Sequence, residues 1–295
     1  MTHSVVDGIA LDSLPLTDRG GAYGHGLFET MLLHHGALPL RQQHSERLLR
    51  DAPILGITIA QQQLQRSAAN TLESNLDNNI NSLIQGLSRA QRESGIVKTI
   101  VTAGSGGRGY APPAEAEAVP RVIAQYFPLP SSIQIQRQRG ISLTECAYRL
   151  PLHPILAGIK HLNRLDQVMA RSEWIDEYDD GIMFAADDSV IETTRANLFI
   201  KVSSGWVTPC LDQAGVRGVM RELLIDRLFA SVGLEVQQTT IGREQLLDAS
   251  EMFTCSSVRG IVPVTSIKTA VTLAIGNDTR RLQGALENNY QGFPC

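Results

Sequence analysis

A short proline-containing segment, PLPSS at 128–132, constrains the fold of this chain more than any other feature of its sequence. Pro128 and Pro130 interrupt regular elements, so the segment is typical of a linker between two folding units. The chain has 295 residues, of which 43% are hydrophobic, and this is enough for more than one buried core. We therefore predict an N-terminal domain over 1–127, a linker over 128–132 and a C-terminal domain over 133–295.

The order of strand-like and helix-like patterns predicts that both domains are of the α+β class, with a cleft between them. Apolar alternation predicts strands and apolar spacing of three to four residues predicts helices. In the first domain we expect strands at 26–33, 38–40, 97–104 and 121–129, and helices at 42–57 and 61–92. In the second domain we expect a strand at 140–150, three short strands within 181–209, a glycine-led loop and helix at 211–233, and a strand–turn–strand at 251–267.

Composition and charge argue against several classes of protein. The formal net charge is −4 and the sequence pI is about 6.0, so the chain lacks the basic excess of a nucleic-acid-binding protein. No apolar run approaches the roughly 18–20 residues that span a bilayer, and the N-terminus does not resemble a signal peptide. Cys146, Cys210, Cys255 and Cys295 show no metal-binding spacing. We therefore expect a cytoplasmic enzyme or binding protein with reduced cysteines, no metal site, and neither nucleic acid nor membrane as a partner.

Lys160 has the most distinctive surroundings of any lysine in the chain. Pro151 and Pro154 disfavour a helix before it, whereas the apolar spacing that follows predicts that a helix begins near His161. A helix N-terminus, neighbouring positive charge and burial by flanking apolar side chains would each lower the pKa of this lysine. A neutral amine can then attack a carbonyl and form an imine. The alternative is an ordinary lysine at a helix end.

Three further features strengthen the chemical interpretation. Glu192 lies in a β-rich segment, where a carboxylate is costly unless it meets a cation or a proton donor; otherwise it lies on an exposed edge strand. Gly215 and Gly218 precede a helix whose N–H groups could bind a phosphate, although such loops are common. Arg47 could pair with the same phosphate or be a surface charge. An imine-forming lysine, an acid and a phosphate cup are together what pyridoxal phosphate requires.

At these positions the sequence resembles the fold-type IV pyridoxal-phosphate enzymes, which include branched-chain and D-amino-acid aminotransferases and aminodeoxychorismate lyases. The resemblance covers nearly the whole chain. The segments that carry it are DRGGAYGHGLFET, HSERL, VIETTRANLF, LDQAGVRGVMRELL and EMFTCSSVRGIVPV. It implies a two-domain α+β fold with a small N-terminal domain, a larger β-rich C-terminal domain and the active site between them. It also implies a homodimer.

The resemblance assigns particular residues to the cofactor. Lys160 would carry the Schiff base and act as the catalytic base, and Glu192 would face the pyridine nitrogen. Arg47, two backbone N–H groups and one hydroxyl would hold the phosphate. The residues implied for cofactor binding are Lys160, Arg47, Glu192, Val219, Met220 and Ser257.

Three positions depart from the pattern of the family. Met220 stands where aminotransferases commonly have a threonine, so one side-chain contact to the phosphate should be missing. Ser257 also replaces a frequent threonine, but its hydroxyl should serve. His25 occupies a position often held by aspartate, and the sequence offers no reason for this change.

Within the family, the segments GSGGRGY, AGIKHLNRLDQVMAR and LDQAGVRG are most similar to the aminodeoxychorismate lyases. This similarity implies conversion of 4-amino-4-deoxychorismate into 4-aminobenzoate and pyruvate, a step toward folate. Arginine suits the two carboxylates of this small-molecule substrate, because its planar fork pairs with both oxygens. The candidates for substrate contact are Arg108, Tyr110, Thr30, Arg164 and Arg259. Each arginine could instead form a surface or intersubunit ion pair, and Thr30 could simply fill its strand.

Two other functions fit the same sequence. A D-amino-acid or branched-chain aminotransferase would also need Lys160 and Glu192, so these residues do not separate it from a lyase. A non-catalytic binding protein could keep the fold without the chemistry. The presence of both residues argues against such a loss of activity.

Overall fold

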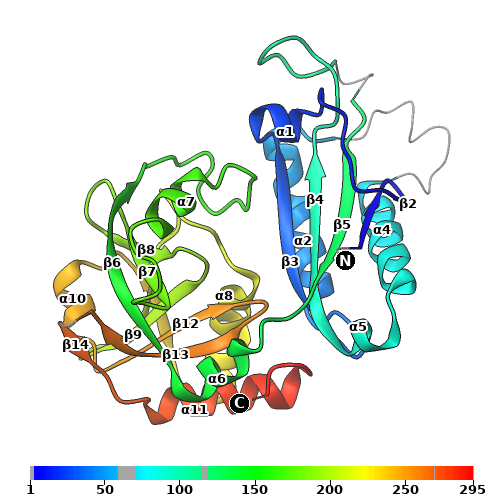
Figure 1. Cartoon of the computed structure of the whole chain (residues 1–295). Coiled ribbons are helices and arrows are strands. Elements are labelled where there is room, and N and C mark those ends of the chain that lie inside the picture. The colour runs from blue at the N-terminus through cyan, green and yellow to red at the C-terminus, as the bar shows by residue number, and fades with distance from the viewer. Residues whose placement is uncertain (1–2, 59–70, 115–117, 269, 295) are drawn as a thin grey trace. The chain divides into compact units, whose positions relative to one another are not determined.

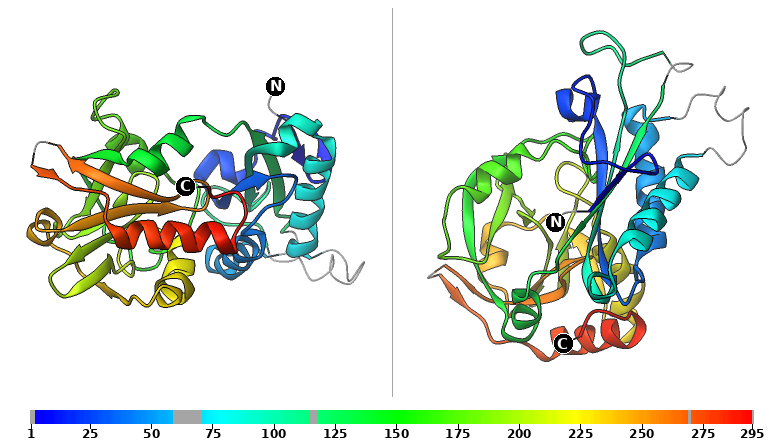
Figure 2. Two further views of the ribbon diagram at one scale, coloured as in Figure 1. Left: turned by 90° about the horizontal axis from the view of Figure 1, so that it is seen from below. Right: turned by 45° about the vertical axis from the view of Figure 1, so that its right-hand side comes forward.

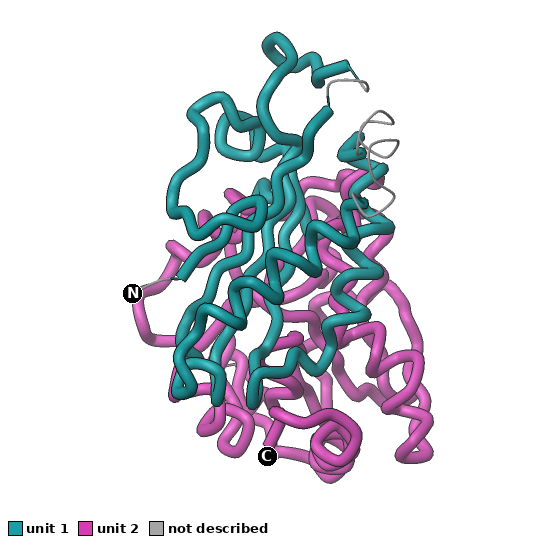
Figure 3. Tube along the Cα trace, turned by 90° about the vertical axis from the view of Figure 1, so that its right-hand side faces the viewer, with its two compact units in different colours: residues 1–129, 160–163 teal, residues 130–159, 164–295 magenta. Residues whose placement is uncertain are grey.

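The computed structural model describes residues 3–58, 71–114, 118–268 and 270–294 (Figure 1). The chain folds into two compact units, which are coloured separately in Figure 3. Unit 1 comprises 1–129 and 160–163, and unit 2 comprises 130–159 and 164–295. The division after Leu129 falls inside the segment predicted as the linker. Residues 160–163, which the sequence analysis placed in the second domain, group with unit 1.

Unit 1 is built on a five-stranded antiparallel sheet with the strand order β2-β1-β5-β4-β3. Its strands are β1 Ser4–Val6, β2 Ile9–Ala10, β3 Gly26–His34, β4 Ser94–Thr102 and β5 Arg121–Phe127. The strands predicted near 26, 97 and 121 are therefore confirmed. The return strand predicted at 38–40 is wrong, because a tight turn through His35 (φ 47°) and Gly36 (φ 77°) leads directly into a helix.

Helices α2 and α4 lie side by side on one face of this sheet (Figure 2). Leu76, Ile80 and Leu83 of α4 are buried. The described helical segments of unit 1 are α1 Arg19–Tyr23, α2 Arg41–Asp51, the short 3₁₀ turn Ala52–Leu55, α4 Leu72–Gly86 and α5 Arg89–Glu93. The helix predicted at 61–92 is in part outside the described residues. Its remainder forms two helices, because a capping box between Ser88 and Gln91 starts the second one.

Unit 2 contains a nine-stranded mixed sheet with the order β11-β10-β9-β12-β13-β6-β7-β8, and β14 pairs with β13. Its strands are β6 Ile141–Leu150, β7 Asp180–Ala185, β8 Val190–Thr193, β9 Asn197–Val202, β10 Gly205–Pro209, β11 Val236–Thr239, β12 Glu251–Ser256, β13 Gly260–Ile267 and β14 Val271–Thr272. The expectation of three short strands within 181–209 is wrong, since there are four. A turn in which the Thr193 hydroxyl accepts from the backbone N–H of Ala196 (3.0 Å) separates β8 from β9.

Both faces of this sheet are buried along β7. Along β7, Ile182 and Phe184 belong to one apolar cluster, whereas Met183 and Ala185 belong to the other. This alternation follows from the two-residue period of a strand. Strand β8, which carries Glu192, also contributes to both clusters, through Val190 and Ile191.

The helices of unit 2 differ from the sequence-based expectation in four places, because those at 132–139, 243–247 and 277–289 were not predicted and the one at 165–171 begins later than expected. They are α6 Ser132–Arg139, α7 Leu165–Arg171, α8 Val219–Leu223, the π-helical turn η3 Leu224–Leu228, α9 Phe229–Ser231, α10 Arg243–Leu247 and α11 Asn277–Asn289. We did not predict α6, because Ile133 and Ile135 alternate as in a strand; only Ile133 and Arg137 of this helix are buried. Helix α7 begins at Leu165 and not near His161.

Candidate functional site

Glu192 is held by neutral hydrogen-bond donors in the interior of unit 2. The residue lies in β8 and is 5% exposed. Its Oε2 accepts from the backbone N–H of Val216 (3.0 Å) and from Nδ2 of Asn197 (3.4 Å). The same Nδ2 also donates to the carbonyl of Val216 (2.8 Å). Strands β8 and β9 thus fasten the glycine-rich loop, and the loop in turn fixes the orientation of the carboxylate.

The glycine-rich loop leads into a helix N-terminus that no side chain caps. Gly215 has φ +84°, which favours glycine. A Cβ at Gly218 would lie 2.1 Å from Oδ1 of Asn197, so the backbone approaches this side chain too closely for another residue. Gly218 is the N-cap of α8, without a side-chain hydrogen bond to the first turn. Val219 and Met220 therefore begin the helix in the arrangement that binds anions.

The charge of Glu192 acts on the guanidinium of Arg164. Arg164 immediately precedes α7, and burial lowers the pKa of its guanidinium, while Glu192 and Asp166 oppose this shift. The side chains that follow it, Leu165 and Val168, are 67% and 60% exposed. These apolar side chains of α7 thus lie on the surface of the chain.

The turn between β12 and β13 carries Ser257 and Arg259. The backbone N–H of Arg259 donates to Oγ of Ser256 (3.2 Å), and its Nη1 donates to Oε1 of Gln136 (2.7 Å). Burial, and then repulsion from Arg195, lowers the pKa of Arg259 to about 10. Arg259 therefore remains a cation at neutral pH, and its side chain is held in place by an amide.

Lys160 lies in an extended segment of unit 1 and not at a helix N-terminus. The backbone N–H of Phe28 donates to the carbonyl of Lys160 (3.0 Å), and that of Leu162 donates to the carbonyl of Gly26 (2.9 Å). His161 forms an antiparallel bridge with Leu27. The expected influence of a helix dipole on Lys160 is therefore wrong, because strand pairing occupies the residues that would have begun the helix.

The aromatic ring of Phe28 has two ammonium groups near it. Nζ of Lys160 lies 4.4 Å from the ring centroid, and Nζ of Lys98 lies 5.1 Å from it. Lys98 is paired across the sheet with Thr30, and burial lowers its pKa. Thr30, Lys98 and Lys160 thus belong to one cluster around Phe28, in which the sequence analysis had included only Thr30 and Lys160.

Arg47 belongs to a buried charge cluster on the opposite side of β3. Its Nε donates to Oε1 of Glu29 (2.8 Å), and its Nη2 donates to Oε2 of the same carboxylate. His44 Nδ1 lies 2.5 Å from Oε2 of Glu29. Although burial alone raises the pKa of Glu29, Arg47 and His44 lower it to about 2. Burial lowers the pKa of His44, and the charge of Glu29 opposes this shift.

Glu29 and His44 are residues that the sequence analysis missed. The available signal was the spacing of three residues between His44 and Arg47, which puts both on one face of α2. The other signal was the acidic Glu29 between apolar neighbours in a strand. A buried carboxylate on a strand requires a cation, and Arg47 supplies it.

The segment that contains Arg108 and Tyr110 is organised by Arg19. The buried guanidinium of Arg19 donates to the carbonyls of four residues of this segment, at 3.1–3.2 Å: Gly106, Gly109, Tyr110 and Ala111. Its Nε donates to Nδ1 of His25 (3.3 Å), and Nε2 of His25 donates to the carbonyl of Leu55 (2.7 Å). His25 therefore orients Arg19, which gives a physical reason for histidine at this position. Arg108 and Tyr110 themselves are exposed.

The candidate residues are distributed over both units. Unit 1 contains Lys160, Arg47, Thr30, Arg108 and Tyr110. Unit 2 contains Glu192, Val219, Met220, Ser257, Arg164 and Arg259. Within unit 1, Lys160 and Thr30 share the surroundings of Phe28; within unit 2, Glu192 shares its surroundings with Arg164 and with the loop before α8.

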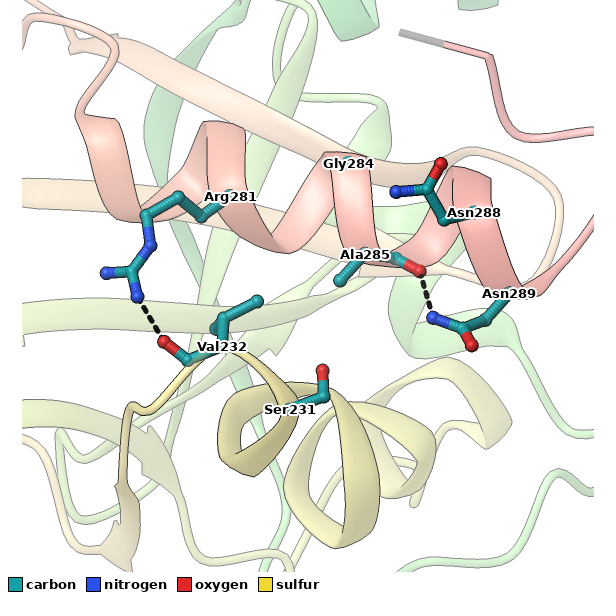
Figure 4. Close-up of a pocket in the computed structure, with 7 residues that line it drawn as sticks. All are labelled: Ser231, Val232, Arg281, Gly284, Ala285, Asn288 and Asn289. Carbon is teal, nitrogen blue, oxygen red and sulfur yellow. Dashed lines mark hydrogen bonds between the residues drawn. The ribbon is translucent and has the colours of Figure 1, made fainter.

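A surface hollow between α9 and α11 lies apart from these residues within unit 2 (Figure 4). Its single cation, Arg281, already donates to Asp278 and to the carbonyl of Val232. Over the described ranges, no cluster of three metal-ligating side chains occurs. No helix in these ranges is both long and apolar enough to cross a bilayer.

The chain matches a known protein family. Residues 26–267 match the model of the amino-transferase class IV family, so the chain belongs to this family. Aminodeoxychorismate lyase from Vibrio harveyi is 35% identical to it over 95% of this chain and 98% of the relative. D-alanine aminotransferase from Bacillus licheniformis is 25% identical over 94% of this chain and 92% of the relative.

Solved structures show the same similarity. The crystal structure of 4-amino-4-deoxychorismate lyase from Pseudomonas aeruginosa superimposes with a TM-score of 0.82 and 36% identity, over 97% of this chain and 98% of the other. Branched-chain amino acid aminotransferase from Escherichia coli has a TM-score of 0.79 at 20% identity, over 99% of this chain and 96% of the other. The predicted fold-type IV architecture is therefore confirmed.

We predict that Glu29→Gln lowers the free energy of unfolding at pH 7 by about 3–5 kcal/mol, because it leaves the charge of Arg47 buried without its carboxylate. Urea denaturation checks this. The matched control is Glu46→Gln on the exposed side of α2, which should change stability by less than about 0.5 kcal/mol. Equal effects of the two substitutions would contradict the buried ion pair.

The same variant should reveal a pH dependence. The pKa of Glu29 is lowered from 4.5 to about 2, so its stabilising contribution is complete above pH 4.5 and is lost as the pH falls toward 2. The stability difference between wild type and Glu29→Gln should therefore narrow over this interval. A difference that stays constant as the pH falls would be inconsistent with a depressed pKa.

Proposed function

We propose that this chain is a pyridoxal-phosphate-dependent lyase that converts 4-amino-4-deoxychorismate into 4-aminobenzoate and pyruvate. The observation that carries the proposal is similarity at 35–36% identity, over 95–97% of the chain, to two proteins named as this lyase. The location of Lys160 and Glu192 supports it, because both groups needed for cofactor chemistry are present. The reaction would contribute to folate synthesis.

The residues of the chain fit pyridoxal phosphate. Lys160 offers an ammonium beside an aromatic ring, and Glu192 offers an oriented carboxylate for the pyridine nitrogen. The uncapped N-terminus of α8 offers backbone N–H groups at Val219 and Met220 for the phosphate. Ser257 would add a hydroxyl. Arg47, whose Nε and Nη2 donate to Glu29, would add a cation.

When bound, pyridoxal phosphate supplies a ring that accepts the electrons released at the amine-bearing carbon of the substrate. Nζ of Lys160 would hold the cofactor and would be the base that removes the proton from that carbon. It would then deliver a proton to the departing enolpyruvyl group, which becomes pyruvate. Glu192 would keep the pyridine nitrogen protonated throughout.

The substrate carries two carboxylates away from its amine, so the site needs several cations or donors. Arg108, Tyr110 and Thr30 of unit 1 remain our candidates, and Lys98 joins them because it shares the surroundings of Phe28. Arg164 and Arg259 are the candidates of unit 2. A planar guanidinium can pair with both oxygens of a carboxylate.

We also propose a homodimer located in the cytoplasm. The exposed apolar side chains of α7, at Leu165, Val168 and Met169, support an association between copies. The thiols of Cys146 and Cys255 are buried and unpaired, which suits a reducing compartment.

An aminotransferase is the second candidate, because D-alanine aminotransferase from Bacillus licheniformis matches 94% of the chain. The deciding experiment incubates the purified protein with pyridoxal phosphate and aminodeoxychorismate. A lyase releases pyruvate and 4-aminobenzoate in equal amounts without an added keto acid. Turnover of D-alanine or branched-chain amino acids that depends on 2-oxoglutarate, without release of 4-aminobenzoate, would overturn the lyase proposal.

In the same assay, Lys160→Ala should abolish both turnover and the visible absorbance of the bound cofactor, because no other group is expected to hold its aldehyde. Lys201→Ala is the control. Lys201 forms an ion pair with Asp278, and its loss should leave the spectrum unchanged. Normal absorbance in Lys160→Ala would place the attachment elsewhere, with Lys98 tested next.

Glu192→Gln should lower kcat by about 10²–10⁴-fold while the cofactor remains bound, because an amide does not keep the pyridine nitrogen protonated. Single-turnover kinetics and the visible spectrum measure the two effects separately. Near wild-type turnover would show that Glu192 is not the partner of the ring.

Arg108→Ala should raise KM for aminodeoxychorismate by about 10²-fold, as expected for the loss of a charge-assisted pair with a carboxylate. The cofactor spectrum should not change. Arg89→Ala, at an exposed arginine at the start of α5, serves as a control for lost surface charge. Loss of cofactor instead of a change in KM would assign Arg108 to the phosphate.

A further inference from the structure

The helix α6, which follows the linker, contacts the turn that carries Arg259 through two consecutive residues. Arg137 is buried and donates from Nε to the carbonyl of Arg259 (2.7 Å) and from Nη2 to the carbonyl of Val258 (3.1 Å). Its Nη1 donates to the carbonyl of Pro294 (3.3 Å). The backbone of the turn is therefore fixed by a side chain from α6.

Gln136 holds the side chain of the same turn. Its Oε1 accepts from Nη1 of Arg259 (2.7 Å), and its Nε2 donates to Oδ1 of Asp179 (2.9 Å). The two contacts demand opposite ends of the amide, because a guanidinium only donates and a carboxylate only accepts. The orientation of Gln136 is thereby determined, and an amide separates the cation from the carboxylate.

The charge of Arg259 is consequently not matched by a direct ion pair. Among the described residues, Arg259 forms no salt bridge, although Asp179 lies at the far end of the same amide. Asp179 is engaged elsewhere, since its Oδ2 accepts from the backbone N–H of Ser142 (2.9 Å). Asp180 is likewise paired with Arg195. A half-buried guanidinium held by a neutral amide retains its charge for an anionic ligand.

We propose that Gln136 is a positioning residue that holds Arg259 for a carboxylate of the substrate while keeping Asp179 from neutralising it. This inference rests on the proposed function, in which the substrate carries carboxylates. Gln136 itself does not touch the substrate. It acts through the direction and the uncompensated charge of Arg259.

The test compares two substitutions that separate charge from hydrogen bonding. Gln136→Glu keeps the size of the side chain and places a carboxylate against Arg259. Gln136→Met removes both hydrogen bonds without adding charge. If Gln136 preserves the charge of Arg259, the holoenzyme of Gln136→Glu should bind the carboxylate ligand about 10²-fold more weakly, and Gln136→Met only about 10-fold. If Gln136 were purely structural, Gln136→Met would weaken binding more than Gln136→Glu, because methionine loses both hydrogen bonds.

Gln134→Glu is the matched control, since Gln134 lies on the exposed side of the same helix. It should not alter binding. The measurements are KM and kcat for aminodeoxychorismate, together with titration of the visible spectrum by 4-aminobenzoate and by D-alanine. KM should rise in Gln136→Glu while kcat and cofactor affinity stay within about twofold.

The outcomes distinguish this inference from the proposed function. Wild type that binds a carboxylate ligand but does not cleave aminodeoxychorismate refutes the lyase, and the order of the two Gln136 variants still decides the inference. Equal binding by wild type and Gln136→Glu overturns it. The inference is also overturned if Gln134→Glu weakens binding as much as Gln136→Glu does. It is overturned as well if the wild type binds neither 4-aminobenzoate nor D-alanine.

Discussion

Main-chain pairing between β3 and residues 160–162 is the constraint on which the candidate site of unit 1 depends. The backbone of this segment is bonded to Phe28 and Gly26, so the position of Lys160 follows from strand register and not from contacts of its ammonium group. The segment 160–162 runs so close to β3 that position 26 must be glycine. A Cβ there would lie 2.5 Å from the carbonyl oxygen of Val101 and 2.6 Å from Cδ1 of Leu162.

The buried carboxylates of the two units, Glu29 and Glu192, have different kinds of hydrogen-bond partner. Glu29 is matched by the guanidinium of Arg47, so its charge is neutralised within the unit. Glu192 is held on one oxygen by neutral donors from Val216 and Asn197. The charge of Glu192 also acts on Arg164, where it opposes the lowering of the pKa by burial. Glu29 is thus bound by two nitrogens of one guanidinium, whereas the hydrogen bonds to Oε2 of Glu192 come from neutral groups.

The sequence predicted more of the fold than of the site. Strands with clear alternation, such as 26–33, were found because one side of each strand is buried. Helix α6 was missed because its buried face consists of Ile133 and Arg137, and an arginine carries no apolar signal. The start of α7 was misplaced because Leu162 continues the helical spacing, although its backbone pairs with Gly26. Such pairing joins residues that are distant in sequence, and local patterns do not record it.

The hydrogen-bond partners of charged residues could not be predicted from the sequence either. The sequence singled out Arg47 and Arg259, but not their hydrogen-bond partners Glu29 and Gln136. For His25, the change from the pattern of the family became intelligible only through its contact with Arg19.

The π-helical turn at Leu224–Leu228 has a consequence for chain length. It adds one residue to the helix that begins at Val219, and so turns Phe229 toward Phe199, whose ring lies 5.6 Å away in a stacked arrangement. Loss of one residue here would restore an α-helix and rotate Phe229 by about 100° away from its neighbours. The number of residues between the N-terminus of α8 and the aromatic cluster around Phe229 is thus fixed, so that a deletion between them would disturb the packing of Phe229.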